Sequence, residues 1–210
     1  MASRLVYVMD PMCSWCWGFA PVLEALLEQA ARAEVSMHLV VGGLRQEYAL
    51  LDAAGRERTL GYWRTVQEMT GQAFDMEQGL PAGFVYDTEP ACRAVVVARE
   101  TDAESAWPLA RRIHQAFYCE GQDVARPAVL VELARQTGLD ARVFARRFDS
   151  PLMREATRDE ILWTRNLGLS GFPTLLAERN GLLSLLTNGY QSLDRLAPLL
   201  GRWLEQQAHD

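Results

Sequence analysis

The sequence predicts an α/β protein whose sheet is interrupted by a long helical segment. Residues 4–9 and 35–41 are short apolar runs rich in β-branched side chains, and a helical pattern lies between them. From residue 45 to residue 168 the patterns are helical, and after Gly171 β-rich runs return. We therefore expect a strand–helix–strand opening, an all-helical insertion and a strand–strand–helix ending.

The opening unit has the pattern of two parallel strands joined by a helix. In residues 4–9 the side chains that would point to either face of a strand are apolar, which predicts a central strand buried on both faces. Residues 14–32 follow with apolar side chains at helical spacing, and Pro21 inside them predicts a kink. Strand, helix and strand with short loops predict a right-handed crossover between parallel strands.

The insertion has clear start and stop signals for helices. Thr88 and Ser150 are typical N-cap residues, and Gly71 and Gly138 are typical residues just past a helix end. One helix carries Trp107. The others are expected at residues 57–70, 88–100, 127–138, 140–148 and 150–168.

The ending predicts a hairpin followed by a helix. Residues 174–177 and 182–186 are β-rich and flank Asn180-Gly181, and this dipeptide is a strong signal for a tight hairpin turn. From Ser192 onward, leucines recur at helical spacing, which predicts a last amphipathic helix.

The motif Cys13-Ser14-Trp15-Cys16 lies directly after the first strand and directly before the first helix. This context is typical of a redox-active pair. Cys13 would lie at the helix N-terminus, where unpaired N–H groups and the helix dipole favour a thiolate. Cys16 would lie one turn later on the same side, close enough for a disulfide. We therefore expect Cys13 to be the exposed attacking thiol and Cys16 the buried resolving thiol.

Two other interpretations of the pair are a zinc site and a pair of inert core thiols. A zinc site usually needs a second pair of ligands in register. The remaining cysteines, Cys92 and Cys119, are isolated, and the histidines are scattered at His38, His114 and His209. We expect no metal site, and we expect Cys92 and Cys119 to be inert core residues.

Several other polar residues have structural interpretations that compete with functional ones. His114 lies among apolar residues and is expected to be a packed histidine rather than a base. Asp10 precedes Pro11 and is expected to form a turn rather than to accept a proton. Trp15 and Trp17 flank the pair and could form an apolar rim for a substrate, although Trp17 is equally expected in the core.

Composition narrows the function further. The chain has 210 residues, 49% of them hydrophobic, and a formal net charge of −6, which argues against nucleic acid as a partner. All 21 Lys and Arg residues are Arg, so a Lys Schiff base or a catalytic Lys base is excluded.

The apolar run near the start is shorter than the roughly 7–15 residues of a signal peptide, and no run approaches the ~20 residues of a membrane span. We expect a cytoplasmic protein without membrane contact, and cytoplasmic disulfides are usually transient and catalytic.

The pair, the helical insertion and the motif Gly171-Phe172-Pro173-Thr174 before the third strand together resemble one family. The sequence is similar to the DsbA family of thioredoxin-fold proteins, and in particular to its cytosolic FrnE-like branch, which includes 2-hydroxychromene-2-carboxylate isomerases. The resemblance covers essentially the whole chain. It implies a thioredoxin-like domain formed by residues 1–44 and 169–210, with residues 45–168 as an inserted helical domain.

The resemblance also implies roles for individual residues. Pro173 would be cis and would pack against the cysteine pair, and the backbone of Phe172 would bind a thiol-containing peptide as an added strand. Cys13 would be the nucleophile and Cys16 the resolving thiol. Secreted family members have Pro-His between the cysteines, whereas this chain has Ser14-Trp15 and no cation there. A weaker oxidant or a reductase-like protein is expected, with Ser14, Trp15 and Phe172 contacting the substrate.

The function predicted from the sequence is thiol–disulfide exchange on a thiol- or disulfide-containing protein or small molecule, through a Cys13–Cys16 disulfide. No metal or nucleotide cofactor is implied, and glutathione is a candidate co-substrate. One alternative is a glutathione-dependent isomerase or transferase on the same scaffold, which would need only one nucleophile. A second alternative is a non-catalytic peptide-binding module. The oligomeric state stays open.

Overall fold

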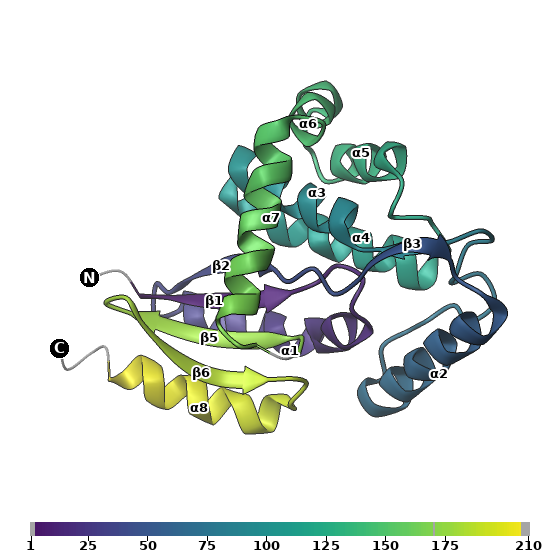
Figure 1. The fold of residues 1–210 in the computed structure, drawn as a ribbon. Coiled ribbons are helices and arrows are strands. Elements are labelled where there is room, and N and C mark those ends of the chain that lie inside the picture. Colours follow the sequence, from purple (N-terminus) through teal and green to yellow (C-terminus); the bar gives the residue numbers. More distant parts are fainter. Residues whose placement is uncertain (1–2, 170, 207–210) are drawn as a thin grey trace.

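The computed structural model describes residues 3–169 and 171–206. Its central sheet has four strands in the order β2-β1-β5-β6 (Figure 1). β1 (Ser3–Met9) pairs in parallel with β2 (Ser36–Val41) and antiparallel with β5, so it is an interior strand. The predicted parallel opening with a central first strand is confirmed.

The end of the chain forms the predicted hairpin and helix. β5 (Thr174–Arg179) and β6 (Leu182–Asn188) pair antiparallel. Asn180 and Gly181 join them with positive φ angles of 53° and 78°, the left-handed conformation that this dipeptide tolerates. α8 (Leu193–Glu205) follows and contacts α1 (Ser14–Ala31). His209 lies outside the described residues, as do residues 1–2, 170 and 207–210 of the expected domain ranges.

The two faces of β1 belong to two different hydrophobic clusters. Leu5, Tyr7 and Met9 point into the main core together with the buried residues of α1. Val6 and Val8 point to the opposite face, where they form a small cluster with residues of β2 and β5. Both faces of the strand are therefore covered, which explains why this run is apolar at every position from Leu5 to Met9.

The insertion contains helices at the predicted places and one feature that the sequence analysis missed. The expectation of an all-helical insertion is wrong, because β3 and β4 form a short antiparallel pair. The pattern was invisible because all five residues of β3 are exposed and β4 is only three residues long. The elements are β3 (Gln46–Leu50), α2 (Ala53–Thr70), β4 (Val85–Asp87), α3 (Glu89–Thr101), a 3₁₀ turn (Ala103–Ser105), α4 (Ala106–Cys119), α5 (Pro127–Gln136), α6 (Ala141–Phe148) and α7 (Pro151–Asn166).

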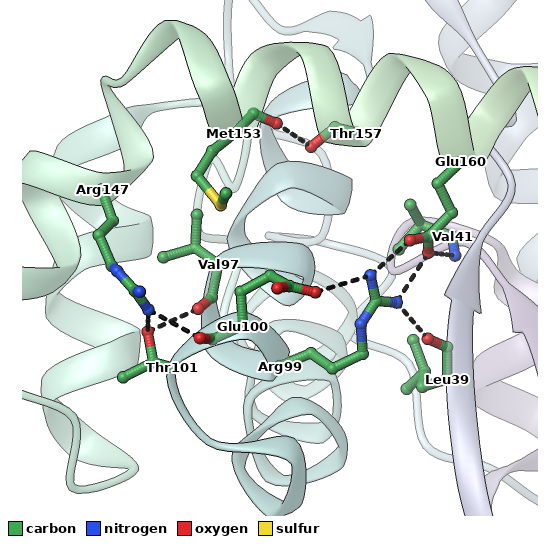
Figure 2. A network of polar contacts seen from close by, with 10 residues as sticks. All are labelled: Leu39, Val41, Val97, Arg99, Glu100, Thr101, Arg147, Met153, Thr157 and Glu160. Carbon is green, nitrogen blue, oxygen red and sulfur yellow. Dashed lines mark hydrogen bonds and ion pairs between the residues drawn. The ribbon is translucent and has the colours of Figure 1, made fainter.

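α7 links the insertion back to the sheet, and in Figure 1 it crosses in front of the strands. A buried ion pair fixes it there (Figure 2). The guanidinium of Arg99, on α3, donates to both carboxylate oxygens of Glu160, on α7, at 2.9 and 2.5 Å. Arg99 also donates to the carbonyl of Leu39, and Glu160 accepts the N–H of Val41 at 2.6 Å. One charged pair therefore joins α3, α7 and β2.

The division into two domains stays a prediction. One hydrophobic cluster contains residues of the sheet and α1 together with residues of α2, α3 and α4. Among the described residues, no helix is long and apolar enough to cross a membrane.

Removing the carboxylate of Glu160 should destabilise the fold. The side chains of Arg99 and Glu160 are only 10% and 13% exposed, so Glu160→Ala would leave a desolvated guanidinium whose remaining carboxylate neighbour is the half-exposed Glu100, 3.6 Å away. We expect the free energy of unfolding, measured by urea denaturation, to fall by about 3 kcal/mol. Glu57→Ala is the matched control, because Glu57 forms an exposed pair with Arg64 and should cost less than about 1 kcal/mol. Equal losses in the two variants would contradict the stabilising role of the buried pair.

Candidate active site

The two cysteines lie at the start of α1, as the sequence predicted. Asp10, Pro11 and Met12 form a turn in which the N–H of Cys13 donates to the carbonyl of Asp10 at 3.0 Å. Cys13 is the N-cap of the helix, and its carbonyl accepts the N–H groups of Cys16 and Trp17 at 3.0 and 3.1 Å. All four cysteines of the chain are free thiols.

The burial of the pair differs from the expectation in one respect. Cys16 is fully buried, as predicted, but Cys13 is only 5% exposed and is not an open surface thiol. The Cys13 thiol faces the carbonyl of Phe172, with 3.7 Å between Sγ and the oxygen. The Phe172–Pro173 bond is cis, in agreement with the resemblance. The segment before β5 therefore lies directly against the first thiol.

The surroundings of Cys16 keep it protonated. Burial raises the pKa of this thiol well above its usual value, and the hydrogen bond and charge of Cys13 raise it further. A thiol that stays neutral while its neighbour reacts is suited to act second, once the first sulfur has been used.

Asp10 does more than form the turn that the sequence predicted. Its side chain is fully buried and accepts N–H groups from Met12 at 2.8 Å and from Leu44 at 2.6 Å. It also accepts the hydroxyl of Thr88 at 2.7 Å and lies 3.4 Å from the sulfur of Cys92. Burial raises the pKa of Asp10, while these hydrogen bonds act in the opposite direction. Thr88 was expected to cap α3 with its side chain, but the hydroxyl is used for Asp10 instead.

A layer of buried aromatic and polar side chains lies behind the pair, and the sequence analysis did not find it. The hydroxyl of Tyr86 donates to the carbonyl of Met12 at 2.8 Å. Tyr7 is fully buried, and its pKa is raised first by burial and then by the nearby charges of Cys16 and Cys13. Tyr118 is also fully buried, and its ring lies 4.9 Å from that of Trp63. These tyrosines come from three distant parts of the chain, so no local motif could have revealed them.

The two histidines within the described residues, His114 and His38, show no sign of catalytic use. His114 is fully buried and packs against the rings of Trp17 and Tyr118, with ring centroids 5.7 and 6.1 Å away. Burial and the charge of Arg111 lower its pKa to about 3, so it is neutral and packed, as predicted. His38 is partly buried in β2, and burial lowers its pKa as well.

The two tryptophans beside the pair have different environments. Trp17 is 4% exposed and donates its indole N–H to the carbonyl of Ala73 at 2.9 Å, so it belongs to the core and not to a rim. Trp15 and Ser14 are partly exposed, and the Trp15 ring lies 5.9 Å from that of Tyr190. The three residues predicted to contact a substrate, Ser14, Trp15 and Phe172, therefore lie near Cys13, and the side chain of each is partly exposed.

The ring of Phe172 lies over Gly42, at the end of β2. A β-carbon at position 42 would overlap the ring atoms of Phe172, so glycine is required for this close approach. The loop that follows β2 thereby reaches the segment that carries Pro173.

The other two cysteines differ in burial: Cys92 is buried and Cys119 is partly exposed. Cys92 is fully buried, as predicted, and burial and the charge of Asp10 raise its pKa. Cys119 is only partly buried, so the expectation of a core thiol is wrong for it. Its thiol lies 3.3 Å from the carbonyl of Ala73. Within residues 3–169 and 171–206, no three metal-ligating side chains are grouped as a metal site would need.

Comparison with known proteins agrees with this arrangement. Residues 4–201 match the model of the DSBA-like thioredoxin domain family. A protein from Nitrosomonas europaea, proposed to be a protein disulfide isomerase, is 37% identical with a TM-score of 0.90, over 98% of this chain and 99% of that one. The cytosolic disulfide reductase DsbM from Pseudomonas aeruginosa is 28% identical with a TM-score of 0.77, over 98% of both chains, and its structure has also been determined with GSH.

A curated relative with a different described role is more distant. The ClpXP adapter protein SpxH from Halalkalibacterium halodurans is 24% identical over 174 residues, which are 80% of this chain. The chain spans 56% of the length of that relative. Because the family model matches almost the whole chain, from β1 into α8, the protein is a member of the DSBA-like thioredoxin domain family.

Proposed function

We propose that this protein is a thiol–disulfide oxidoreductase that uses Cys13 and Cys16 in a dithiol–disulfide cycle. The observation that carries the proposal is the asymmetry of the pair at the start of α1. Cys13 caps the helix and faces the segment before Pro173, whereas Cys16 is fully buried one turn later. Family membership supports thiol–disulfide exchange as the reaction class.

In the proposed cycle, the Cys13 thiolate attacks one sulfur of a substrate disulfide. A mixed disulfide forms, and the substrate's other sulfur leaves as a thiolate that takes up a proton. Cys16 then loses its proton and attacks the sulfur of Cys13, which releases the second substrate thiol and closes the Cys13–Cys16 disulfide. The substrate gains the two electrons that the protein loses. An external thiol, for which glutathione is the candidate, returns them.

Residues around Cys13 are proposed to bind the substrate. Phe172 would pair its backbone with an extended peptide by strand addition, and Pro173, which has no N–H, would end that pairing. Ser14 and Trp15 would contact the substrate on the other side of the sulfur, where both side chains are partly exposed.

The direction of electron flow is proposed to be reductive, and the location cytoplasmic. Secreted members of the family have a histidine between the cysteines, whereas Ser14-Trp15 supplies no cation beside Cys13. Weak stabilisation of the thiolate makes the disulfide a poor oxidant. The similarity to a cytosolic disulfide reductase is compatible with both proposals.

The reduction potential should be that of a reductase or glutaredoxin. We expect titration in glutathione buffers, followed by tryptophan fluorescence, to give a two-electron transition between about −200 and −270 mV. Trp15 and Trp17 flank the pair and should report its oxidation. Cys13→Ser is the control and should show no two-electron transition. A potential near about −120 mV would instead indicate a strong oxidant.

Replacing the resolving thiol should trap the intermediate. In Cys16→Ala, Cys13 can still attack a disulfide substrate but cannot be released by an intramolecular reaction. We expect turnover to fall to near background while a mixed disulfide at Cys13 accumulates, as measured by mass spectrometry. Cys92→Ala is the control for loss of a buried thiol and should retain turnover. Full turnover in Cys16→Ala would favour the glutathione-dependent isomerase or transferase, which needs a single nucleophile.

The resolving step should accelerate with pH. Burial is the main cause of the raised pKa of Cys16, and it persists when Cys13 is in a mixed disulfide. Because the attacking species is the thiolate, its fraction rises about tenfold per pH unit as long as the pH stays below the pKa. We expect the decay rate of a preformed mixed disulfide, followed by stopped-flow fluorescence, to rise in this way from pH 6 to pH 9. A rate that levels off below pH 8 would show that Cys16 ionises in the ordinary range.

A further inference from the structure

The hydroxyl of Tyr7 is a buried polar group that the packing of the core leaves unsatisfied. Tyr7 is fully buried, and its hydroxyl has no aligned hydrogen-bond partner within residues 3–169 and 171–206. Buried hydroxyl groups nearly always have a partner, because burial without one forfeits the hydrogen bonds that water would supply. A phenylalanine would fill the same space without this cost, so the hydroxyl points to a use outside the resting state of the core.

The Tyr7 ring lies against the first turns of α1. Its side chain leaves β1 on the face that packs on this helix, in the same hydrophobic cluster as Cys16. The ring centroid lies 6.0 Å from that of Phe19, which is three residues after Cys16 and therefore on the same side of α1. The ring of Trp107, on α4, contacts Tyr7 edge to face at 5.9 Å. These aromatic contacts fix the ring beside the turn that carries Cys16.

The Tyr7 hydroxyl is closer to the second sulfur of the pair than to the first. Burial is the main cause of the raised pKa of Tyr7, the charge of Cys16 raises it more than that of Cys13, and a side-chain hydrogen bond with Cys16 adds to it. The raised pKa of Tyr118 shows the reverse order, since the charge of Cys13 contributes more than that of Cys16. Tyr7 is thus within reach of Cys16, although the two groups are not aligned for a hydrogen bond in the dithiol form.

The other polar neighbours of Cys16 supply no side-chain donor. The carboxylate of Asp10 is engaged with other donors, and its negative charge raises the pKa of Cys16. A backbone hydrogen bond with Asp10 lowers the pKa of Cys16, but burial outweighs it. Cys13 has no proton to donate once its sulfur is part of a mixed disulfide. The hydroxyl of Tyr7 is therefore the side-chain donor best placed to stabilise a charge on Cys16.

We propose that the hydroxyl of Tyr7 donates a hydrogen bond to the sulfur of Cys16 while this sulfur carries negative charge in the resolving step. The inference rests on the proposed function and adds a catalytic residue to it, since Tyr7 would touch a reacting atom. Hydrogen bonds to charged acceptors are about twice as strong as those between neutral groups. The hydroxyl therefore gains most when the thiolate forms, and an interaction that strengthens towards the transition state raises the rate.

In the resolving step, Cys16 loses its proton to the solvent, and its thiolate attacks the sulfur of Cys13. The Cys13–Cys16 bond forms, the bond between Cys13 and the substrate sulfur breaks, and the substrate sulfur leaves with the electron pair. Tyr7 keeps its own proton throughout, in agreement with its raised pKa. In the reverse reaction Cys16 is the leaving group, and the same hydrogen bond stabilises the departing thiolate.

The test resolves the reactions of the two sulfurs in one experiment. Reduced protein in a Cys119→Ala background, which removes the partly exposed thiol, is mixed with excess dithiobis(nitrobenzoate). One coloured half is released when Cys13 attacks, at a rate that rises with probe concentration, and the other when Cys16 resolves, at a rate that does not. We expect Tyr7→Phe to lower the second rate constant about tenfold, because a hydrogen bond to a charged group is lost, and to leave the first unchanged.

Two further variants separate this role from a structural one. Tyr7→3-fluorotyrosine keeps the ring and makes the hydroxyl a stronger donor, so the second rate constant should rise instead of falling. Thr157→Val is the matched control, because it also removes a fully buried hydroxyl, on α7, and it should leave both rate constants unchanged. Since the Tyr7 hydroxyl is unsatisfied in the dithiol, the urea midpoint of Tyr7→Phe should equal or exceed that of the parent protein.

The proposal is overturned if the second rate constant is the same in Tyr7→Phe and its parent, or if both rate constants fall alike. It is also overturned if the phenylalanine and fluorotyrosine variants change the second rate constant in the same direction. The proposed function itself has a separate readout in the parent protein. Release of only one coloured half, without a Cys13–Cys16 disulfide, would overturn that function and this proposal with it.

Discussion

The buried carboxylate of Asp10 is the constraint on which the arrangement of the site depends. It accepts hydrogen bonds from Met12 in the turn before Cys13, from Leu44 directly before the insertion and from Thr88 at the start of α3. A buried charge is tolerated only where several donors compensate its desolvation. These three segments must therefore stay together for the carboxylate to be satisfied. The insertion is thereby fixed to the sheet at the point where α1 and its two cysteines begin.

The same region places the two buried sulfurs in different surroundings. Cys13 faces the carbonyl of Phe172, and Cys16 faces Tyr7 and the aromatic layer behind it. Desolvation favours the neutral thiol at Cys16, whereas Cys13 lies at the helix end, where the first backbone N–H groups have no partner within the helix. The two cysteines of one four-residue motif therefore have different chemical surroundings, set by what packs on either side of them.

Features with local signals were predictable from the sequence, and features made by distant residues were not. α5, α6 and α7 begin at Pro127, Ala141 and Pro151, as their proline and cap residues indicated, and the Asn180-Gly181 turn is present. The β3–β4 pair was missed because strands that are so short and exposed carry no alternating pattern.

The same distinction applies to the site: its contiguous motifs were predictable from the sequence, and the residues that tertiary packing brings to it were not. The cysteine pair and the motif around Pro173 were recognisable, because each is contiguous in the chain. Tyr7, Tyr86 and Tyr118 could not be assigned to the site, because only tertiary packing places them behind Cys16. Thr88 had the right residue type for a helix cap, but its hydroxyl is committed to Asp10, and a local rule cannot detect such a competing long-range partner.

The contact between Gly42 and Phe172 has a consequence for how such a protein can diverge. Phe172 precedes Pro173 and its carbonyl faces the Cys13 thiol, so under the proposed function its side chain is a position at which substrate preference can change. Its ring, however, occupies the space that any side chain at position 42 would need. A larger residue at 42 therefore becomes admissible only after position 172 has become smaller, and a return to an aromatic residue at 172 is then blocked. The order in which the two substitutions arise decides which specificities remain accessible to the lineage.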